Sequence, residues 1–208
     1  MLNELLSRYP QLETCKNDIE TAVKSIIECF EKGGKLILCG NGGSCADCDH
    51  IVGELMKGFL KLRPLNDNKK SEMKKNCDLV DDELLSKLQG SLPAISLPSI
   101  TALNSAFCND VDPELMYAQP LMSLANKNDI LIGLSTSGNS KNVYGAVKVA
   151  KALGIKVIGL TGAKGGKLKG VSDVCITAPE TETFKIQELH LPIYHYICAV
   201  VEEHFYKD

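Results

Sequence analysis

The stretch from Asp129 to Ser140, Asp-Ile-Leu-Ile-Gly-Leu-Ser-Thr-Ser-Gly-Asn-Ser, decides how this chain folds. Its first half is an apolar run typical of a buried strand, and the pattern that follows it, over residues 141–153, is helical. In the hydroxyl-rich turn between them, the first N–H groups of the helix have no partner inside the helix, and the macrodipole favours negative charge. The turn therefore predicts a phosphate site. The alternative is an ordinary Ser/Asn-rich loop that caps a helix.

Short β-branched runs and helical patterns alternate on both sides of this stretch. They predict an α/β fold with a doubly wound, five-stranded parallel sheet of the flavodoxin-like type, flanked by helices. The expected strands lie at residues 35–39, 94–97, 130–134, 156–160 and 174–177. The expected helices lie at residues 13–30, 45–60, 100–107, 113–125, 141–153 and 182–205.

The length and composition of the chain agree with one domain. Its 208 residues, 44% of them apolar, are enough for a single core, and we expect one domain over residues 1–208 with N-terminal helices over about residues 1–31. Residues 65–90 interrupt the step from helix to strand with charged and amide side chains, then a short helical pattern that ends at Gly90. We expect this insertion to be surface-exposed and mobile in its first half.

Charge and cysteine usage exclude several classes of protein. A net charge of -3, no tryptophan and 5% aromatic residues leave no basic or base-stacking surface, so we expect no nucleic-acid partner. No signal sequence or run of about 20 apolar residues is present, so we expect a soluble, cytoplasmic protein with no membrane partner. The nine cysteines are expected to be reduced, and we interpret the C-x-x-C of Cys45 and Cys48 as two small buried hydrophobes.

A second glycine-rich turn, Cys39-Gly-Asn-Gly-Gly-Ser44, follows the first expected strand and opens a helix. Glycines there let the backbone approach a ligand closely. A dinucleotide fingerprint would require glycine where Cys45 stands, and no Walker lysine follows, so the nucleotide interpretations fail. Ligands of an open α/β sheet bind beyond the carboxyl ends of the strands, where such turns converge. The two turns together predict one site for a small polyol phosphate.

Two helices carry side chains at spacings that suit a metal site. His50 and Glu54 are four residues apart and share a helix face. Gln187 and His195 are eight apart on the last helix, so their directions differ by only about 80° at about 100° per residue. The pairs predict a divalent-metal site, with a solvated His/Glu pair as the alternative for the first of them.

Six motifs in this order resemble those of the phosphoheptose isomerases, in the sugar isomerase (SIS) domain superfamily. They are C-G-N-G-G-S, H-x-x-x-E, N-D, S-T-S-G-N-S, L-T-G, and I-Q-E-x-H with a further histidine five residues on. The resemblance covers nearly the whole chain apart from residues 65–90. By this resemblance the substrate contacts are Asn41, Gly42, Gly43, Glu54, Asn109, Asp110, Ser135, Thr136, Ser137, Ser140 and Gln187. The zinc ligands implied are His50, Glu54, Gln187 and His195.

The reaction implied is the interconversion of sedoheptulose 7-phosphate and D-glycero-D-manno-heptose 7-phosphate, an aldose–ketose isomerisation. Moving a carbonyl between C1 and C2 needs a base for a carbon-bound proton and donors for the oxygens. Glu54 and His195 match the residues with acid/base roles, and the sequence leaves open which of them is the base. Zinc would assist the enediol step by stabilising negative charge. The resemblance also implies a homotetramer.

Two departures from the family pattern leave the substrate open. Phe184-Lys185 stands where family members carry an acidic or polar residue and then arginine, and Lys57-Gly58 stands where an arginine is expected after Glu54. The alternatives are therefore an isomerase of another phosphorylated sugar, and a non-catalytic sugar-phosphate-binding or adaptor protein of the same fold. The adaptor branch lacks the acid/base pair, so the presence of Glu54 and His195 favours an enzyme.

Overall fold

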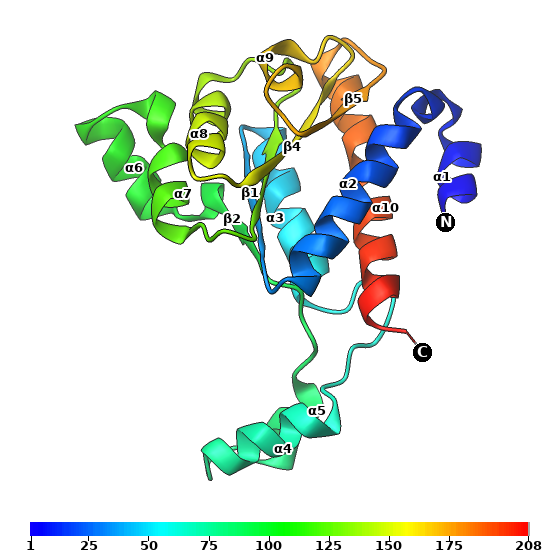
Figure 1. Cartoon of the computed structure of the whole chain (residues 1–208), viewed down its shortest axis with the longest axis vertical. Helices are drawn as coiled ribbons and strands as arrows, with labels where there is room; N and C mark the ends of the chain where they lie inside the picture. Colours follow the sequence, from blue (N-terminus) through cyan, green and yellow to red (C-terminus); the bar gives the residue numbers. More distant parts are fainter. Residues whose placement is uncertain (208) are drawn as a thin grey trace.

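The computed structural model describes residues 1–207 and has a five-stranded, all-parallel sheet with strand order β2-β1-β3-β4-β5 (Figure 1). The strands are β1 Leu36–Gly40, β2 Ala94–Ser96, β3 Ile130–Leu134, β4 Lys156–Gly162 and β5 Val174–Ala178. The predicted doubly wound, flavodoxin-like sheet is confirmed, because the order turns back between β1 and β3. All nine cysteines are free thiols, as expected.

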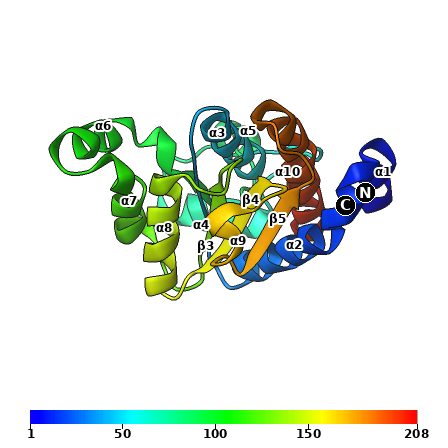
Figure 2. The same cartoon turned by 90° about the horizontal axis from the view of Figure 1, so that it is seen from above.

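Helices cover both faces of the sheet (Figure 2). They are α1 Leu2–Arg8, α2 Lys16–Glu31, α3 Gly43–Met56, α4 Asp67–Asn76, α5 Asp82–Lys87, α6 Thr101–Asp110, α7 Ala118–Leu124, α8 Lys141–Ala152, α9 Gly166–Lys169 and α10 Thr183–Phe205. Short 3₁₀ turns lie at Pro10–Cys15, Leu97–Ser99 and Pro113–Leu115. Among the described residues, no helix is long and apolar enough to span a membrane.

Side chains of the central strands belong alternately to two hydrophobic cores, one on each face of the sheet. In β1, Leu36 and Leu38 belong to the core that includes α2, α3 and α10, whereas Ile37 and Cys39 belong to the core under α7 and α8. Every residue of β1 and β3 is buried. Burial on both faces is why these strands read as continuous apolar runs rather than alternating ones.

Three helical segments differ from the sequence prediction. Helix α3 ends at Met56 instead of residue 60, because the chain from Lys57 turns away toward α10. The predicted helix at 113–125 divides into the turn Pro113–Leu115 and α7, and the predicted helix at 13–30 begins as the turn Pro10–Cys15 before α2. These boundaries depend on tertiary contacts rather than on apolar spacing.

Residues 65–90 contain two helices that project from the body of the molecule (Figure 1). Helix α4 was not predicted, since it is highly polar, and no residue of it is buried. A local signal for it exists, because the Asn66 side chain caps the helix by accepting from the Lys69 N–H at 2.8 Å. An antiparallel bridge between Pro64 and Gln89 closes the base of this hairpin. The insertion therefore leaves and rejoins the body at one point.

Candidate active site

The turns after β1 and β3 begin side by side, because Gly40 pairs with Leu134 in the sheet. A pocket of about 290 Å³ lies between these turns, and its polar lining comes from both of them and from the start of α10. The lining residues are Asn41, Gly42, Gly43, Ser44, Leu134, Ser135, Thr136, Ser140, Thr183 and Gln187. The structure thus brings the two predicted turns together at the switch point of the sheet.

The hydroxyl-rich turn presents Ser135 and Ser140 at the N-terminus of α8. Their Oγ atoms lie 2.9 Å apart, and Ser140 is the N-cap residue of the helix. Gly138 has φ +66°, and a Cβ there would collide with the Gly165 carbonyl oxygen, so the turn needs glycine. Ser137 is exposed and does not line the pocket; its Oγ accepts from the Asn139 N–H at 3.1 Å. Two hydroxyls at a helix N-terminus therefore border the pocket, an arrangement that suits an anion.

Asn41 is held by two side chains that the sequence did not single out. Asn142 exchanges two amide hydrogen bonds with Asn41, at 2.8 and 2.9 Å. The Tyr117 hydroxyl donates to the Gly40 carbonyl at 2.7 Å and to Asn41 Oδ1 at 3.1 Å. Because Asn142 lies in the first turn of α8, these contacts fix the first turn of the pocket to the second.

Gly43 leaves room for the Gln187 side chain of α10 beside the pocket. A Cβ at this position would stand 2.5 Å from Gln187 Nε2, closer than non-bonded carbon and nitrogen atoms approach in proteins. Gln187 therefore lies directly against the backbone of the first turn. It stands about two helical turns before His195 on the same helix, α10.

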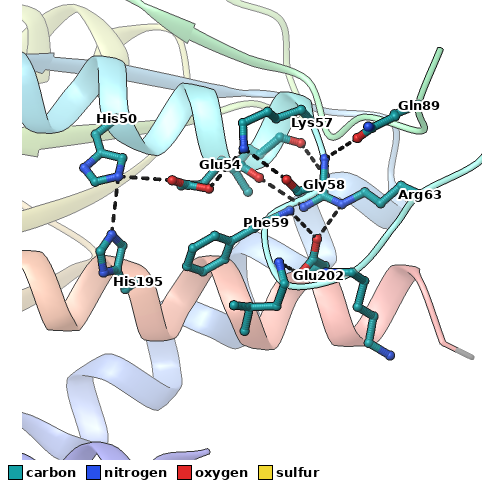
Figure 3. A network of polar contacts seen from close by, with 12 residues as sticks. His50, Glu54, Lys57, Gly58, Phe59, Arg63, Gln89, His195 and Glu202 are labelled. Carbon is teal, nitrogen blue, oxygen red and sulfur yellow. Dashed lines mark hydrogen bonds and ion pairs between the residues drawn. The ribbon is translucent and has the colours of Figure 1, made fainter. Parts of the chain in front are cut away.

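The second cluster consists of His50, Glu54 and His195, from helices α3 and α10 (Figure 3). His50 Nε2 lies 3.1 Å from Glu54 Oε1 and 3.4 Å from His195 Nε2. One ligand atom from each of the three residues lies within 4.8 Å of the others. The prediction that His50 and Glu54 share one helix face is confirmed. The structure also brings His195, which is 145 residues from His50 in the sequence, to this face.

The chemistry of this cluster fits a divalent cation. Glu54 Oε2 is buried and has no hydrogen-bond partner among the described residues; its nearest cation is Lys57 Nζ at 3.8 Å. Two imidazole nitrogens and a carboxylate oxygen are a donor set that zinc accepts. Burial and the adjacent His50 lower the pKa of His195, and together they outweigh Glu54, whose negative charge raises it. The His195 imidazole is therefore neutral at neutral pH and has a lone pair to offer.

Two predicted substrate contacts lie apart from both sites in this chain. Asn109 and Asp110 are exposed at the end of α6, and Asn109 Nδ2 donates to Asp110 Oδ1 at 2.8 Å. Neither residue lines the pocket between the turns. The structure of one chain therefore does not bring the N-D motif to the other predicted residues.

An apolar side chain that the sequence did not point to covers one side of the cluster. The ring of Phe59 lies 5.5 Å from that of His195, and both residues border a cavity of about 490 Å³ between α1 and α10. Phe59 follows the end of α3, within the segment that turns toward α10 (Figure 3). The Phe59 ring therefore covers the His195 side of the cluster with an apolar surface.

The chain resembles known proteins over most of its length. The SIS domain family matches residues 2–90 and 90–162. The phosphoheptose isomerase of Helicobacter pylori (strain P12) is 38% identical over 194 residues, which cover 93% of this chain and 88% of that protein. That of Aneurinibacillus thermoaerophilus is 37% identical over 190 residues, 91% and 83% of the two chains. This chain belongs to the phosphoheptose isomerase family.

Solved structures agree with this assignment. The phosphoheptose isomerase GmhA from Neisseria gonorrhoeae superposes with a TM-score of 0.76 at 28% identity, over 97% of this chain and 94% of that chain. The phosphoheptose isomerase from Francisella tularensis has a TM-score of 0.74 at 29% identity, over 97% and 98%. The predictions of the SIS family and of an isomerase are therefore confirmed. The match to the SIS domain family stops at residue 162, so it includes His50 and Glu54 but not Gln187 or His195.

Proposed function

We propose that the chain interconverts an aldose phosphate and a ketose phosphate through an enediol, with sedoheptulose 7-phosphate and D-glycero-D-manno-heptose 7-phosphate as the pair. The observation that carries the proposal is the His50, Glu54 and His195 cluster, which α10 joins to the pocket between the two turns through Gln187. A phosphate at Ser135, Thr136 and Ser140 would anchor one end of an open-chain sugar. The carbonyl end would then reach the cluster.

The isomerisation requires one proton to leave carbon and others to move between oxygens. We assign to Glu54 the removal of the carbon-bound proton, because its Oε2 is buried and has an unused acceptor position. The pair of electrons released forms the C1–C2 double bond as the carbonyl oxygen gains a proton. His195 is assigned the transfer between the two oxygens, since its neutral imidazole both accepts and donates. Return of the proton to the neighbouring carbon completes the reaction.

Zinc is proposed as the cofactor, held by His50, Glu54 and His195 with the amide oxygen of Gln187 as a fourth ligand. The clustering of one carboxylate oxygen of Glu54 with a ring nitrogen of each imidazole supports it. When bound, zinc would supply Lewis-acid stabilisation of the negative charge that develops on the substrate oxygens. The protein residues keep the tasks of binding the phosphate and of moving the protons.

A homotetramer is proposed as the working form. Large apolar side chains lie exposed near the end of α3 and on α10: Leu60 is 67% exposed, Leu62 88% and Leu191 40%. An assembly would cover such side chains, and a neighbouring chain would be able to bring Asn109 and Asp110 to the pocket. Light scattering at micromolar concentration tests this, and a monomeric mass would reject it.

The experiment for the reaction is solvent deuterium exchange at C1 or C2, measured with pentose, hexose and heptose phosphates. Exchange reports proton abstraction even where net conversion is slow. We expect exchange with the wild-type protein and a loss of roughly 10²–10⁴ in its rate for Glu54→Gln, because the amide no longer accepts a proton. Glu203→Gln, which changes an exposed carboxylate on α10, serves as the control. Binding of a sugar phosphate with no exchange in the wild-type protein would reject the catalytic role.

A further inference from the structure

The side of His50 that faces away from Glu54 carries contacts that the proposed reaction does not use. His50 Nδ1 lies 3.0 Å from the Tyr194 hydroxyl oxygen, and this hydroxyl donates to Asp47 Oδ1 at 3.2 Å. The Tyr194 ring meets the His50 ring edge-on, with centroids 5.4 Å apart and planes at 73°. Tyr194 is only 2% exposed. Asp47, Tyr194 and His50 therefore form a relay of three side chains that leads into the cluster.

The relay contains one hydroxyl hydrogen and two groups able to accept it. An ionised carboxylate only accepts, whereas a neutral imidazole carries its hydrogen on either ring nitrogen. Asp47 Oδ2 is buried and has no hydrogen-bond partner among residues 1–207, so the Tyr194 hydroxyl is the donor on which this carboxylate depends. A buried acceptor left without its donor costs about 1–3 kcal/mol. This cost directs the Tyr194 hydrogen toward Asp47.

The direction of that hydrogen bond decides the state of His50. When the Tyr194 hydroxyl donates its hydrogen bond to Asp47, the Tyr194 oxygen offers only a lone pair to His50 Nδ1. Nδ1 must then carry the imidazole hydrogen. His50 Nε2, which faces Glu54 and His195, then has a free lone pair. The opposite tautomer would donate its Nε2–H to Glu54 Oε1 at 3.1 Å, but it would take the Tyr194 hydrogen for His50 Nδ1 and leave the buried Asp47 without a donor.

We propose that Asp47 and Tyr194 are positioning residues that hold His50 in its Nδ1–H tautomer and so direct the Nε2 lone pair into the cluster. This use of the tautomer rests on the proposed function, in which His50 binds a cation through Nε2. Groups that fix the tautomer of a metal-binding histidine change metal affinity by about 10–100-fold when they are removed. Tyr194 also packs edge-on against His195, so one side chain orients histidines from both helices.

The relay itself is tested in the metal-free protein, by the ¹⁵N chemical shifts of the His50 ring at an alkaline pH where imidazoles are neutral. Signals are assigned by their loss in His50→Asn, and circular dichroism checks that each metal-free protein is folded. We expect the Nδ1–H form in the wild-type protein. In Asp47→Ala the acceptor of the Tyr194 hydrogen is removed, so the hydroxyl is free to donate to His50 Nδ1, and we expect the Nε2–H form. An Nε2–H form in the wild-type protein would overturn the proposal.

Zinc affinity tests what the relay does for the cluster, measured by competition with a chromophoric chelator. Tyr194→Phe keeps the ring and removes only the hydroxyl, and we expect zinc to bind about 10–100-fold more weakly. Tyr196→Phe removes a hydroxyl two residues further along α10 and should leave the affinity unchanged. Equal affinities of Tyr194→Phe and wild-type protein would contradict the role of the relay in metal binding. If the wild-type protein binds no zinc, the metal in the proposed function is rejected. The ¹⁵N chemical shifts of the His50 ring would then be the test of the relay.

Discussion

Arg63 and Glu202 form an ion pair with neither side chain exposed, with Arg63 Nε 2.7 Å from Glu202 Oε1 (Figure 3). The same carboxylate accepts the backbone N–H groups of Phe59, Leu60 and Lys61, at 2.8, 2.7 and 3.2 Å. The segment that follows α3 is therefore tied to α10 by one buried side chain. This segment includes Phe59, which covers His195.

The other donors of Arg63 reach back to the end of α3. They bind the Leu55 carbonyl at 2.7 Å and the Glu54 carbonyl at 3.0 Å, where helix carbonyls lack partners of their own. The guanidinium thus caps the helix that carries Glu54. Burial raises the pKa of Glu202, but the N–H groups of Phe59 and Leu60 together with Arg63 outweigh it, so the carboxylate is ionised.

Removing the charge of Glu202 should destabilise the folded protein. In Glu202→Gln the buried guanidinium loses its counter-charge, and we expect a loss of about 3–5 kcal/mol in the free energy of unfolding, measured in urea. Glu203→Gln is the matched control, since the adjacent Glu203 pairs with Lys61 at 2.8 Å while 48% exposed, and it should cost about 0–1 kcal/mol. Equal losses in the two variants would contradict the structural role of the buried pair.

The hydroxyl pair of the turn after β3 should dominate phosphate binding. Each hydrogen bond from Ser135 or Ser140 to a phosphate contributes about 1.5–3 kcal/mol, so each change to alanine should weaken binding of sedoheptulose 7-phosphate by roughly 10- to 100-fold. Isothermal titration calorimetry measures the affinity. Ser86→Ala, in the projecting hairpin, is the control. Unchanged affinity in both Ser135→Ala and Ser140→Ala would show that phosphate binds elsewhere.

Metal removal should affect both stability and turnover. The proposed ligands come from α3 and α10, so an ion that binds only the folded chain stabilises it by mass action. We expect chelation to lower the melting temperature of the wild-type protein but not that of His50→Asn. In His204→Asn, which changes a surface histidine paired with Glu31, the chelation effect should persist. Full turnover after exhaustive chelation would exclude the metal.

His190 should make stability depend on pH. It is fully buried, its Nε2 lies 3.2 Å from the Thr161 carbonyl oxygen, and burial lowers its pKa from 6.5 to about 4. The unfolded chain then binds a proton that the folded chain does not, so stability is complete above about pH 6.5 and falls as the pH drops toward 4. The loss amounts to roughly 3 kcal/mol.

The test for His190 is the melting temperature between pH 4 and pH 7. His190→Gln keeps a donor for the Thr161 carbonyl and removes the titrating group. Its melting temperature should therefore fall less over this range than that of the wild-type protein, whatever its absolute value. Parallel curves for the two proteins would assign the acid sensitivity to other groups.

Much of the fold follows from local sequence. Apolar runs at 36–40 and 130–134 are strands because both faces are buried, and the glycine and serine residues after them mark where the turns lie. The helical spacing of His50 and Glu54 likewise places them on one face without the help of any tertiary contact. Local patterns of this kind are sufficient to place the sheet, the two turns and two of the three residues of the cluster.

The remaining features depend on how α3 and α10 pack. Arg63 and Glu202 are 139 residues apart, and an isolated arginine carries no sign of a buried partner. Asp47 and Tyr194 look like a surface acid and a core aromatic until the two helices bring the hydroxyl between the carboxylate and His50. The sequence alone thus determined the sheet, the position of the hydroxyl-rich turn and the class of enzyme. Only tertiary packing decided which polar groups are buried together, because the energy of a buried charge depends on partners that sequence spacing does not encode.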